Sequence, residues 1–293
     1  MITDMESATP ALCRLQLGSE LRQLRLRAGL TSTQVVRKLL WSPSKLTRLE
    51  TGENTVVETS DVMALCQILH ASEEECELLK EYAAVTKRKR EWWQSSDYRQ
   101  AIPQGFRAFL GMEGAASALH SYESEFVPGL LQTEDYVRLI HRQAWGGHSD
   151  EDIDRIAEMR MMRKEVLHRK RPLKLSVIIN EAVLLRQVGD PADMRAQLAH
   201  LIEAASLPNV QLQVLPFKAG PHRGMNGSFW TFRFRDHAVL KPIVYLENLA
   251  DQWVARREAD VELYEAVFSE LQAVASSPQE SMSVIKKAME EYR

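Results

Sequence analysis

Two helix-start signals lie close together near the N-terminus and constrain this part of the chain more than any other feature. The tetrapeptide from Thr31 to Gln34 has the form of a capping box, in which the threonine hydroxyl accepts a backbone amide and the glutamine reaches back. At Ser42-Pro43 the signal repeats, because serine caps free amides and proline is tolerated in a first helical turn. The spacing predicts two short helices joined by a tight turn.

The second of these helices is expected to bury one face and expose the other. It runs from Pro43 to about Glu50, with Leu46 and Leu49 on the inner face, and Gly52 is suited to the left-handed conformation that ends a helix. We therefore expect Ser44, Lys45, Thr47 and Arg48 to face mainly outward.

Positive charge gathers in the same region, although the whole chain has a formal net charge of −3. Between Arg14 and Gly52, eight basic residues stand against two acidic ones, a net charge of +6. Such a segment attracts a phosphate backbone. Two short helices with a basic, exposed second member also have the form that enters the major groove of DNA. The alternative is that Lys45 and Arg48 only keep a small helical bundle in solution.

The stretch from Gly29 to Gly52 resembles the lambda-repressor-like (XRE-type) helix-turn-helix family, with which it aligns without a gap. The resemblance implies DNA binding by one phosphate-contacting residue and by a set at the start of the second short helix. These residues are Ser32 for phosphate; Pro43, Ser44 and Arg48 facing bases; and Ser42 and Lys45 beside them.

Chemistry gives some of these residues a specific role. Arg48 is expected to donate two hydrogen bonds to guanine O6 and N7, whereas Lys45 is expected to serve either a base or a phosphate. The same family resemblance pairs Arg25 with Glu50 as a structural contact.

Hydrophobic periodicity divides the chain into three regions. They are a five-helix domain over residues 14–90, which the resemblance implies to be lambda-repressor-like, an irregular connector over 91–111, and an α+β domain over 112–293. Helices are expected at 61–69, 73–86, 113–122, 133–143, 151–171, 192–205, 258–275 and 279–292, and strands at 173–179, 210–215, 229–234 and 243–247. The fold class is therefore mainly α with an α+β C-terminal domain.

The segments from Tyr122 to Tyr136 and from Gln213 to His222 resemble a second family. It is the domain of unknown function that follows an XRE-type helix-turn-helix in actinobacterial antitoxin-like regulators. The resemblance implies that this domain dimerises, senses a signal or binds a partner, often a small protein encoded by the adjacent gene. The loop with His222, Arg223 and Asn226 is expected to border a ligand or partner site, unless His222 only satisfies a local hydrogen bond.

Composition indicates where the protein works. Its three cysteines are far apart in the sequence and form no C-x-x-C pair, which argues against a disulfide framework and a cysteine zinc site. No apolar run is long enough to span a membrane, and the first residues lack a basic signal-peptide start. We therefore expect a cytoplasmic protein that needs no membrane.

An enzyme fused to a DNA reader is the main rival, with Glu181, His222 and Asp251 as its candidate acid and base groups. Because the chain contains no nucleophile elbow, phosphate loop, H-E-x-x-H helix or dinucleotide fingerprint, we expect no enzyme activity, catalytic residue, metal or cofactor. A third possibility is an antitoxin that acts only through protein contacts and has no DNA role. The retained Lys45 and Arg48 favour the DNA-binding alternative.

Overall fold

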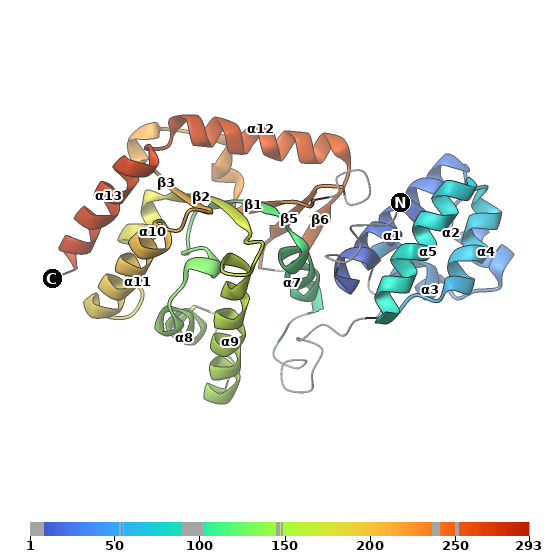
Figure 1. Cartoon of the computed structure of the whole chain (residues 1–293), viewed down its shortest axis with the longest axis horizontal. Helices are drawn as coiled ribbons and strands as arrows, with labels where there is room; N and C mark the ends of the chain where they lie inside the picture. Colours follow the sequence, from blue (N-terminus) through green and yellow to red (C-terminus); the bar gives the residue numbers. More distant parts are fainter. Residues whose placement is uncertain are drawn as a thin grey trace. The chain divides into compact units, whose positions relative to one another are not determined.

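The computed structural model describes residues 9–52, 54, 56–88, 102, 104–144, 147, 149–235, 241–249 and 252–292. They form two compact units, a helical one and one built on a sheet (Figure 1). This arrangement confirms the expected fold class, mainly α with an α+β C-terminal part. Within the described residues, no helix combines the length and the apolar character needed to cross a membrane.

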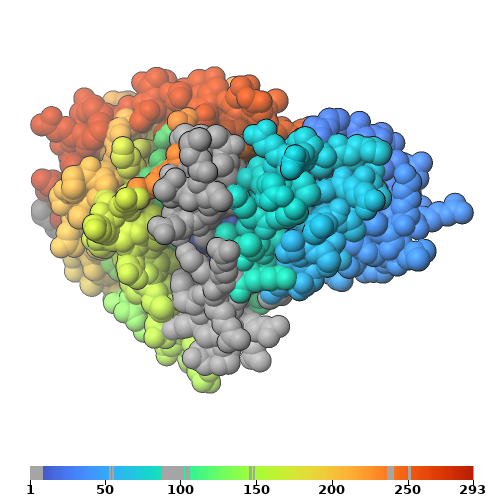
Figure 2. Space-filling view, turned by 45° about the vertical axis from the view of Figure 1, so that its right-hand side comes forward, coloured from blue at the N-terminus to red at the C-terminus, as the bar shows by residue number. Residues whose placement is uncertain are grey.

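The first unit confirms the expected run of five N-terminal helices, and α7 and the described residues from Phe234 to Lys241 also belong to it. In the space-filling view the blue-to-cyan side chains of the five N-terminal helices pack as one body (Figure 2). The helices of this unit are α1 (Pro10–Arg27), α2 (Ser32–Leu39), α3 (Pro43–Thr51), α4 (Thr59–Leu69), α5 (Glu73–Arg88) and α7 (Gln104–Ala115).

Helix α1 begins at Pro10, where the Leu12 amide donates to the Thr9 hydroxyl at 3.3 Å. Its first half is buried and packs against α7. The Thr9 hydroxyl also donates to the Gly111 carbonyl oxygen at 2.7 Å, and a Cβ built on Gly111 would lie 2.2 Å from the Cβ of Ala11. Glycine at position 111 therefore allows the two helices to cross in close contact.

The expected connector and the expected helix at 113–122 need correction. Of the connector 91–111, residues 91–101 and 103 lie outside the described residues, and the chain is helical from Gln104 to Ala115. The next element is a strand, β1 (Ala118–Glu123), rather than the second half of a helix. Gly105 and Gly111, residues that favour irregular chain over helix, both lie in α7, and Gly111 allows the close contact with α1.

The second unit is built on a six-stranded sheet in the order β3-β2-β1-β4-β5-β6. Strand β1 pairs in parallel with β2, and β2 with β3, while β4, β5 and β6 add antiparallel neighbours on the other side. The strands after β1 are β2 (Lys174–Asn180), β3 (Val210–Leu215), β4 (Phe229–Arg233), β5 (Ile243–Glu247) and β6 (Gln252–Ala255).

The helices of this unit cover the sheet, with α12 running along one face and α8, α9 and α11 on the other side in Figure 1. They are α8 (Glu134–Gln143), α9 (Asp150–Arg163), α10 (Glu181–Leu185), α11 (Pro191–Ala204), α12 (Glu258–Val274) and α13 (Pro278–Glu291), with 3-10 turns at Gly129–Leu131, Lys164–Leu167, Phe217–Ala219 and Arg223–Asn226.

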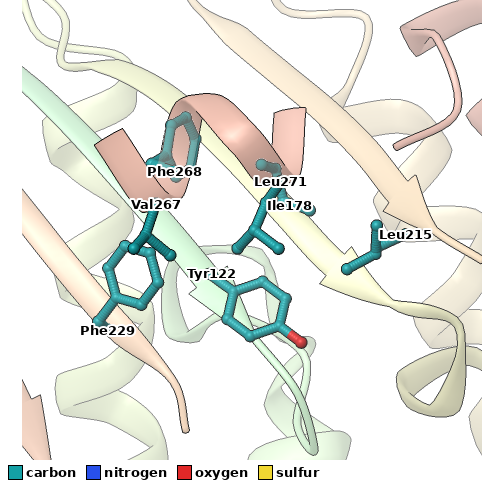
Figure 3. Close-up of a cluster of buried hydrophobic side chains, with 7 residues drawn as sticks. All are labelled: Tyr122, Ile178, Leu215, Phe229, Val267, Phe268 and Leu271. Carbon is teal, nitrogen blue, oxygen red and sulfur yellow. The ribbon is translucent and has the colours of Figure 1, made fainter. Parts of the chain in front are cut away.

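A buried apolar cluster joins α12 to the centre of the sheet (Figure 3). Successive strand residues point to opposite faces, so one residue from each of four neighbouring strands reaches α12. These residues are Tyr122, Ile178, Leu215 and Phe229, and they meet Val267, Phe268 and Leu271 of the helix. Burial of this cluster fixes the sheet against its covering helix.

The four expected strands form within one residue of the predicted bounds, as β2, β3, β4 and β5. The long helix expected at 151–171 instead ends at Arg163 and is followed by a 3-10 turn from Lys164 to Leu167. This turn leads the chain into β2, which pairs with the central strand β1. Strand β6 and the short helix α10 were not predicted.

Candidate nucleic-acid interface

The helix-turn-helix begins with the predicted capping box. The Gln34 amide donates to the Thr31 hydroxyl at 3.2 Å, and the Thr31 amide donates to the Gln34 side-chain oxygen at 2.8 Å. Val35 and Val36 are buried, whereas Ser32 is exposed at the first position of α2. The structure thus leaves Ser32 accessible at the positive end of a helix, where anions bind favourably.

The turn between α2 and α3 passes through a left-handed residue. Leu40 has a φ of 55° and a 93% exposed side chain, and its amide closes α2 by donating to the Val36 carbonyl oxygen. Ser42 then occupies the N-cap of α3, but its side chain makes no capping bond, contrary to prediction. Its hydroxyl instead lies 3.2 Å from that of Ser44.

Helix α3 has one buried and one exposed face. Leu46 and Leu49 are each 1% exposed and hold the helix against the rest of the unit. The opposite face presents short polar side chains and one guanidinium to solvent. Its exposed residues are Ser42, Pro43, Ser44, Thr47 and Arg48.

Lys45 occupies a different environment from these residues. Its ammonium Nζ lies 2.7 Å from Asp61 Oδ1 in the first turn of α4 and 4.1 Å from the centre of the Trp41 ring. The Lys45 side chain is 34% exposed and that of Asp61 is 21% exposed. The lysine that was predicted to lie beside the base-facing residues therefore pairs within the protein.

The pair that the family resemblance implied, Arg25 and Glu50, lies inside the same unit. Two hydrogen bonds join the guanidinium to the carboxylate, at 2.5 and 2.8 Å, and both residues are buried. The hydrogen bond to Glu50 raises the pKa of Arg25, against the opposing effect of burial. A third bond goes from Arg25 to the Leu30 carbonyl oxygen at 3.1 Å, so this pair ties α1 and the α1–α2 loop to the end of α3.

Close approach of α1 also fixes the end of α3. A Cβ built on Gly18 would lie 2.5 Å from the Leu49 carbonyl oxygen, which leaves no room for a side chain. Gly52 caps α3 with a φ of 80°, a conformation that glycine adopts without strain. Helix α3 is thus held at its C-terminal end by backbone contact as well as by the ion pair.

The surface around α3 is less basic than the sequence count suggested. Of the eight basic residues, Arg14 is buried, Arg25 pairs with Glu50, and Arg27 pairs with Glu75 at 2.8 Å. Lys45 is engaged by Asp61. The exposed cations that remain from the count are Arg22, Arg37, Lys38 and Arg48.

In the second unit, the loop predicted to border a ligand or partner site folds over Tyr122. The His222 ring meets the Tyr122 ring edge-on at 5.9 Å, and burial lowers the pKa of His222. Arg223 pairs with Glu270 at 3.4 Å, and the Asn226 amide donates to the Arg223 carbonyl oxygen at 2.9 Å. The loop is therefore held by one hydrogen bond within itself and by contacts with Tyr122 and Glu270.

The candidate acid and base groups of the rival enzyme hypothesis are not brought together by any described contact. A carboxylate oxygen of Glu181 accepts from the Phe217 amide at 2.7 Å, which gives this residue a structural contact. Asp251 lies outside the described residues. No group of three or more His, Cys, Asp or Glu side chains among the described residues is placed to hold a metal.

Trp41 and Asp61 are the residues that sequence reasoning missed at this site. Trp41 lies in the turn between the two predicted helices, and Asp61 was predicted only as the first residue of a helix. No local sequence pattern links Asp61 to Lys45, because the two residues are 16 positions apart. The exposed α3 residue Thr47 also stands between the predicted contacts Ser44 and Arg48.

Comparison with protein families agrees with this geometry. Residues 16–79 match a family model described as a helix-turn-helix domain, which confirms that prediction, and residues 106–287 match one described as a domain of unknown function (DUF5753). No curated protein and no solved structure gives a significant match. Because the second match covers more than half of the sequence, the chain belongs to the DUF5753 family, with a helix-turn-helix domain preceding the family domain.

Proposed function

We propose that the protein is a sequence-specific DNA-binding transcriptional regulator of the XRE type that places α3 in the major groove. The observation that carries the proposal is the two-faced α3, with Leu46 and Leu49 buried and Ser44 and Arg48 exposed on a capped helix-turn-helix. An exposed, polar second helix is what groove entry requires.

Arg48 is the base-reading cation of this proposal, and the exposed Lys38 at the end of α2 supplies phosphate attraction. Pro43 gives α3 a preformed first turn, and Ser32 and Ser42 lie where helix N-termini approach the backbone of the duplex. Bidentate recognition of guanine contributes about 1 to 3 kcal/mol of discrimination against other bases. A phosphate contact carries no such preference.

The test is selection of bound DNA from a random library, followed by affinity measurement over a series of salt concentrations. We expect a defined site whose affinity falls steeply with salt. Arg48→Ala should lose preference at one base pair, whereas Lys38→Ala should weaken all sequences alike and reduce the salt slope by about 1. Absence of any selected sequence for the wild-type protein would rule out the proposal.

A homodimer would place two α3 helices in successive major grooves, about one helical turn or a multiple apart. The selected site is then an inverted repeat, and the length of its spacer reports the separation of the two helices. A single unrepeated half-site bound by a monomer would contradict this part of the proposal. A DNA target also supports the expected cytoplasmic location of the protein.

We assign the DUF5753 domain to dimerisation, sensing or binding of a partner, in an antitoxin-like regulator without catalytic activity. The small protein encoded by the adjacent gene is the partner to test. Support comes from the loop around His222, which is anchored on Tyr122 and leaves Arg223 and Asn226 exposed. Repeating the DNA selection with the adjacent gene product present should alter affinity without changing the base preference.

A further inference from the structure

The first turn of α3 carries a cation whose charge is already balanced by the protein. Lys45 Nζ lies 2.7 Å from a carboxylate oxygen of Asp61, and the Trp41 ring covers it at 4.1 Å from the ring centre. Both members of the ion pair are largely shielded, with exposed side-chain fractions of 34% and 21%. Shielding of this kind reduces screening by salt, so the attraction is stronger than that of an exposed pair.

Arg48, one turn further along α3, differs from Lys45 in its environment. Its side chain is exposed, and within the described part of the chain it forms no ion pair. A guanidinium in this position can approach a base without breaking an ion pair with any residue that the structure describes. Lys45 can do so only by leaving Asp61 and the indole ring.

That exchange is unfavourable beside DNA. If Lys45 moved to a phosphate, the Asp61 carboxylate would remain without its partner, close to a polyanion that repels it. The cation–π contact with Trp41 would also be lost. A phosphate contact therefore replaces two existing interactions and creates a repulsion, whereas retention of the pair creates none.

We infer that Asp61 is a positioning residue that, together with Trp41, retains Lys45 inside the protein, so that Lys45 joins α3 to α4 and does not contact DNA. This inference rests on the proposed function. It narrows the reading face to Ser44, Thr47 and Arg48, which are exposed in the first two turns of α3 after the proline. Asp61 is not among the residues predicted to contact DNA, yet by holding Lys45 it helps to determine which side chains of α3 face the duplex.

The decisive variant is Lys45→Met/Asp61→Asn in the full chain, because it removes both charges and leaves the net charge unchanged. We expect its affinity for the selected site to lie within about twofold of wild type, with the same salt slope and base preference. Lys45→Met alone should bind all sequences more weakly, because it leaves the Asp61 charge without its partner, and adding Asp61→Asn should restore binding.

Duplexes with one neutral methylphosphonate at a time resolve individual phosphate contacts. Wild type and the double variant should lose affinity at the same phosphates. The inference is overturned by one phosphate, or one base pair, whose replacement weakens wild type about tenfold or more but leaves the double variant unaffected. Such a position would be the contact that Lys45 makes.

Two further measurements keep the outcomes separate. Circular dichroism and urea unfolding without DNA establish that each variant is folded. Lys45→Arg provides a second test that does not depend on the double variant, because arginine keeps both the positive charge and the ability to stack on an aromatic ring. Its base preference should match that of wild type. Failure of wild type to select any DNA rejects the proposed function, whereas a Lys45-dependent contact rejects only this inference.

Discussion

Arg25 donates two parallel hydrogen bonds to the carboxylate of Glu50, from Nε at 2.5 Å and from Nη2 at 2.8 Å. Both residues are buried, at 8% and 9% exposure. The pair connects α1 with the last turn of α3, and Arg25 also reaches the carbonyl oxygen of Leu30. The α1–α2 loop and the end of α3 therefore both depend on one guanidinium.

Removal of one member of this pair should strongly destabilise the protein. Arg25→Met leaves a buried carboxylate without its partner, and we expect a loss of about 3 to 5 kcal/mol in the free energy of unfolding. Urea unfolding followed by circular dichroism measures it. The matched control is Arg25→Met/Glu50→Leu, which removes both charges and should recover most of the loss. A double variant as unstable as the single one would show that packing, not charge, dominates at this site.

Because α1 and α7 cross in close contact, we expect alanine substitution to affect stability very differently at two glycines of α7, Gly111 and Gly114. Gly111→Ala would place a methyl group 2.2 Å from the Ala11 Cβ, so we expect a loss of about 1 to 3 kcal/mol in unfolding free energy. At Gly114 the nearest atom to such a methyl is Thr9 Cγ2 at 3.6 Å.

Gly114→Ala is therefore the control, and it should be neutral or stabilise the helix by about 0.5 to 1 kcal/mol. Equal effects of the two substitutions in a thermal or urea unfolding series would mean that α7 does not pack on α1 as described. The double variant Ala11→Gly/Gly111→Ala should recover part of the loss, because it moves the methyl group to the other helix.

Glu123, at the end of the central strand, makes stability depend on pH. Burial raises its pKa from 4.5 to about 8, against hydrogen bonds from Ser228 and Ser121 that lower it. A carboxyl group with a raised pKa contributes its full stability below about pH 4.5 and loses it as the pH rises towards 8. Stability should therefore fall across this interval, by up to about 1.4 kcal/mol per pH unit from this group.

The measurement is urea unfolding of wild type and Glu123→Gln at pH 5, 6.5 and 8. Because the amide cannot ionise, the unfolding free energy of Glu123→Gln should increase relative to that of wild type as the pH rises. Glu125→Gln is the nearby control, since it removes only an exposed ion pair with Arg186 and should cost less than about 1 kcal/mol at each pH. A constant difference between wild type and Glu123→Gln across the range would refute the prediction.

Leu40 predicts a stabilising substitution in the turn of the helix-turn-helix. Its left-handed backbone, with a φ of 55°, is costly for a residue with a Cβ, and its side chain is too exposed to repay the cost by packing. Leu40→Gly should raise the unfolding free energy by about 0.5 to 1 kcal/mol. Leu40→Ala keeps the Cβ and should leave stability nearly unchanged, so a similar gain for both would exclude backbone strain as the cause.

Sequence patterns predicted the helix-turn-helix well because its signals are local. The Thr31 capping box, Pro43 and Gly52 each act within a few residues, and the structure has a helix boundary at each of them. The β2 to β5 strands were also predictable, because their apolar runs are bounded by turn residues.

Elements that depend on distant partners were not predictable in this way. The β1 sequence, Ala-Leu-His-Ser-Tyr-Glu, has no β-branched residue, and it becomes a strand because β2 and β4 pair with it. Glycines in α7 suggested irregular chain, since nothing nearby indicates that Ala11 lies against Gly111. Lys45 looked available for DNA for the same reason, because Asp61 is recognised as its partner only once α3 and α4 pack together.

The hydrogen bond from the Gln16 side chain to the Lys241 carbonyl oxygen joins residues 225 positions apart, and a second link runs from Lys241 to Glu20 at 3.1 Å. Chains are synthesised from the N-terminus, and domains generally fold as they emerge. Helix α1, which packs against α3, is therefore made early but acquires these contacts only after the ribosome has added most of the remaining chain. A nascent chain stalled before residue 241 would therefore present α3 on an α1 that lacks both of these contacts.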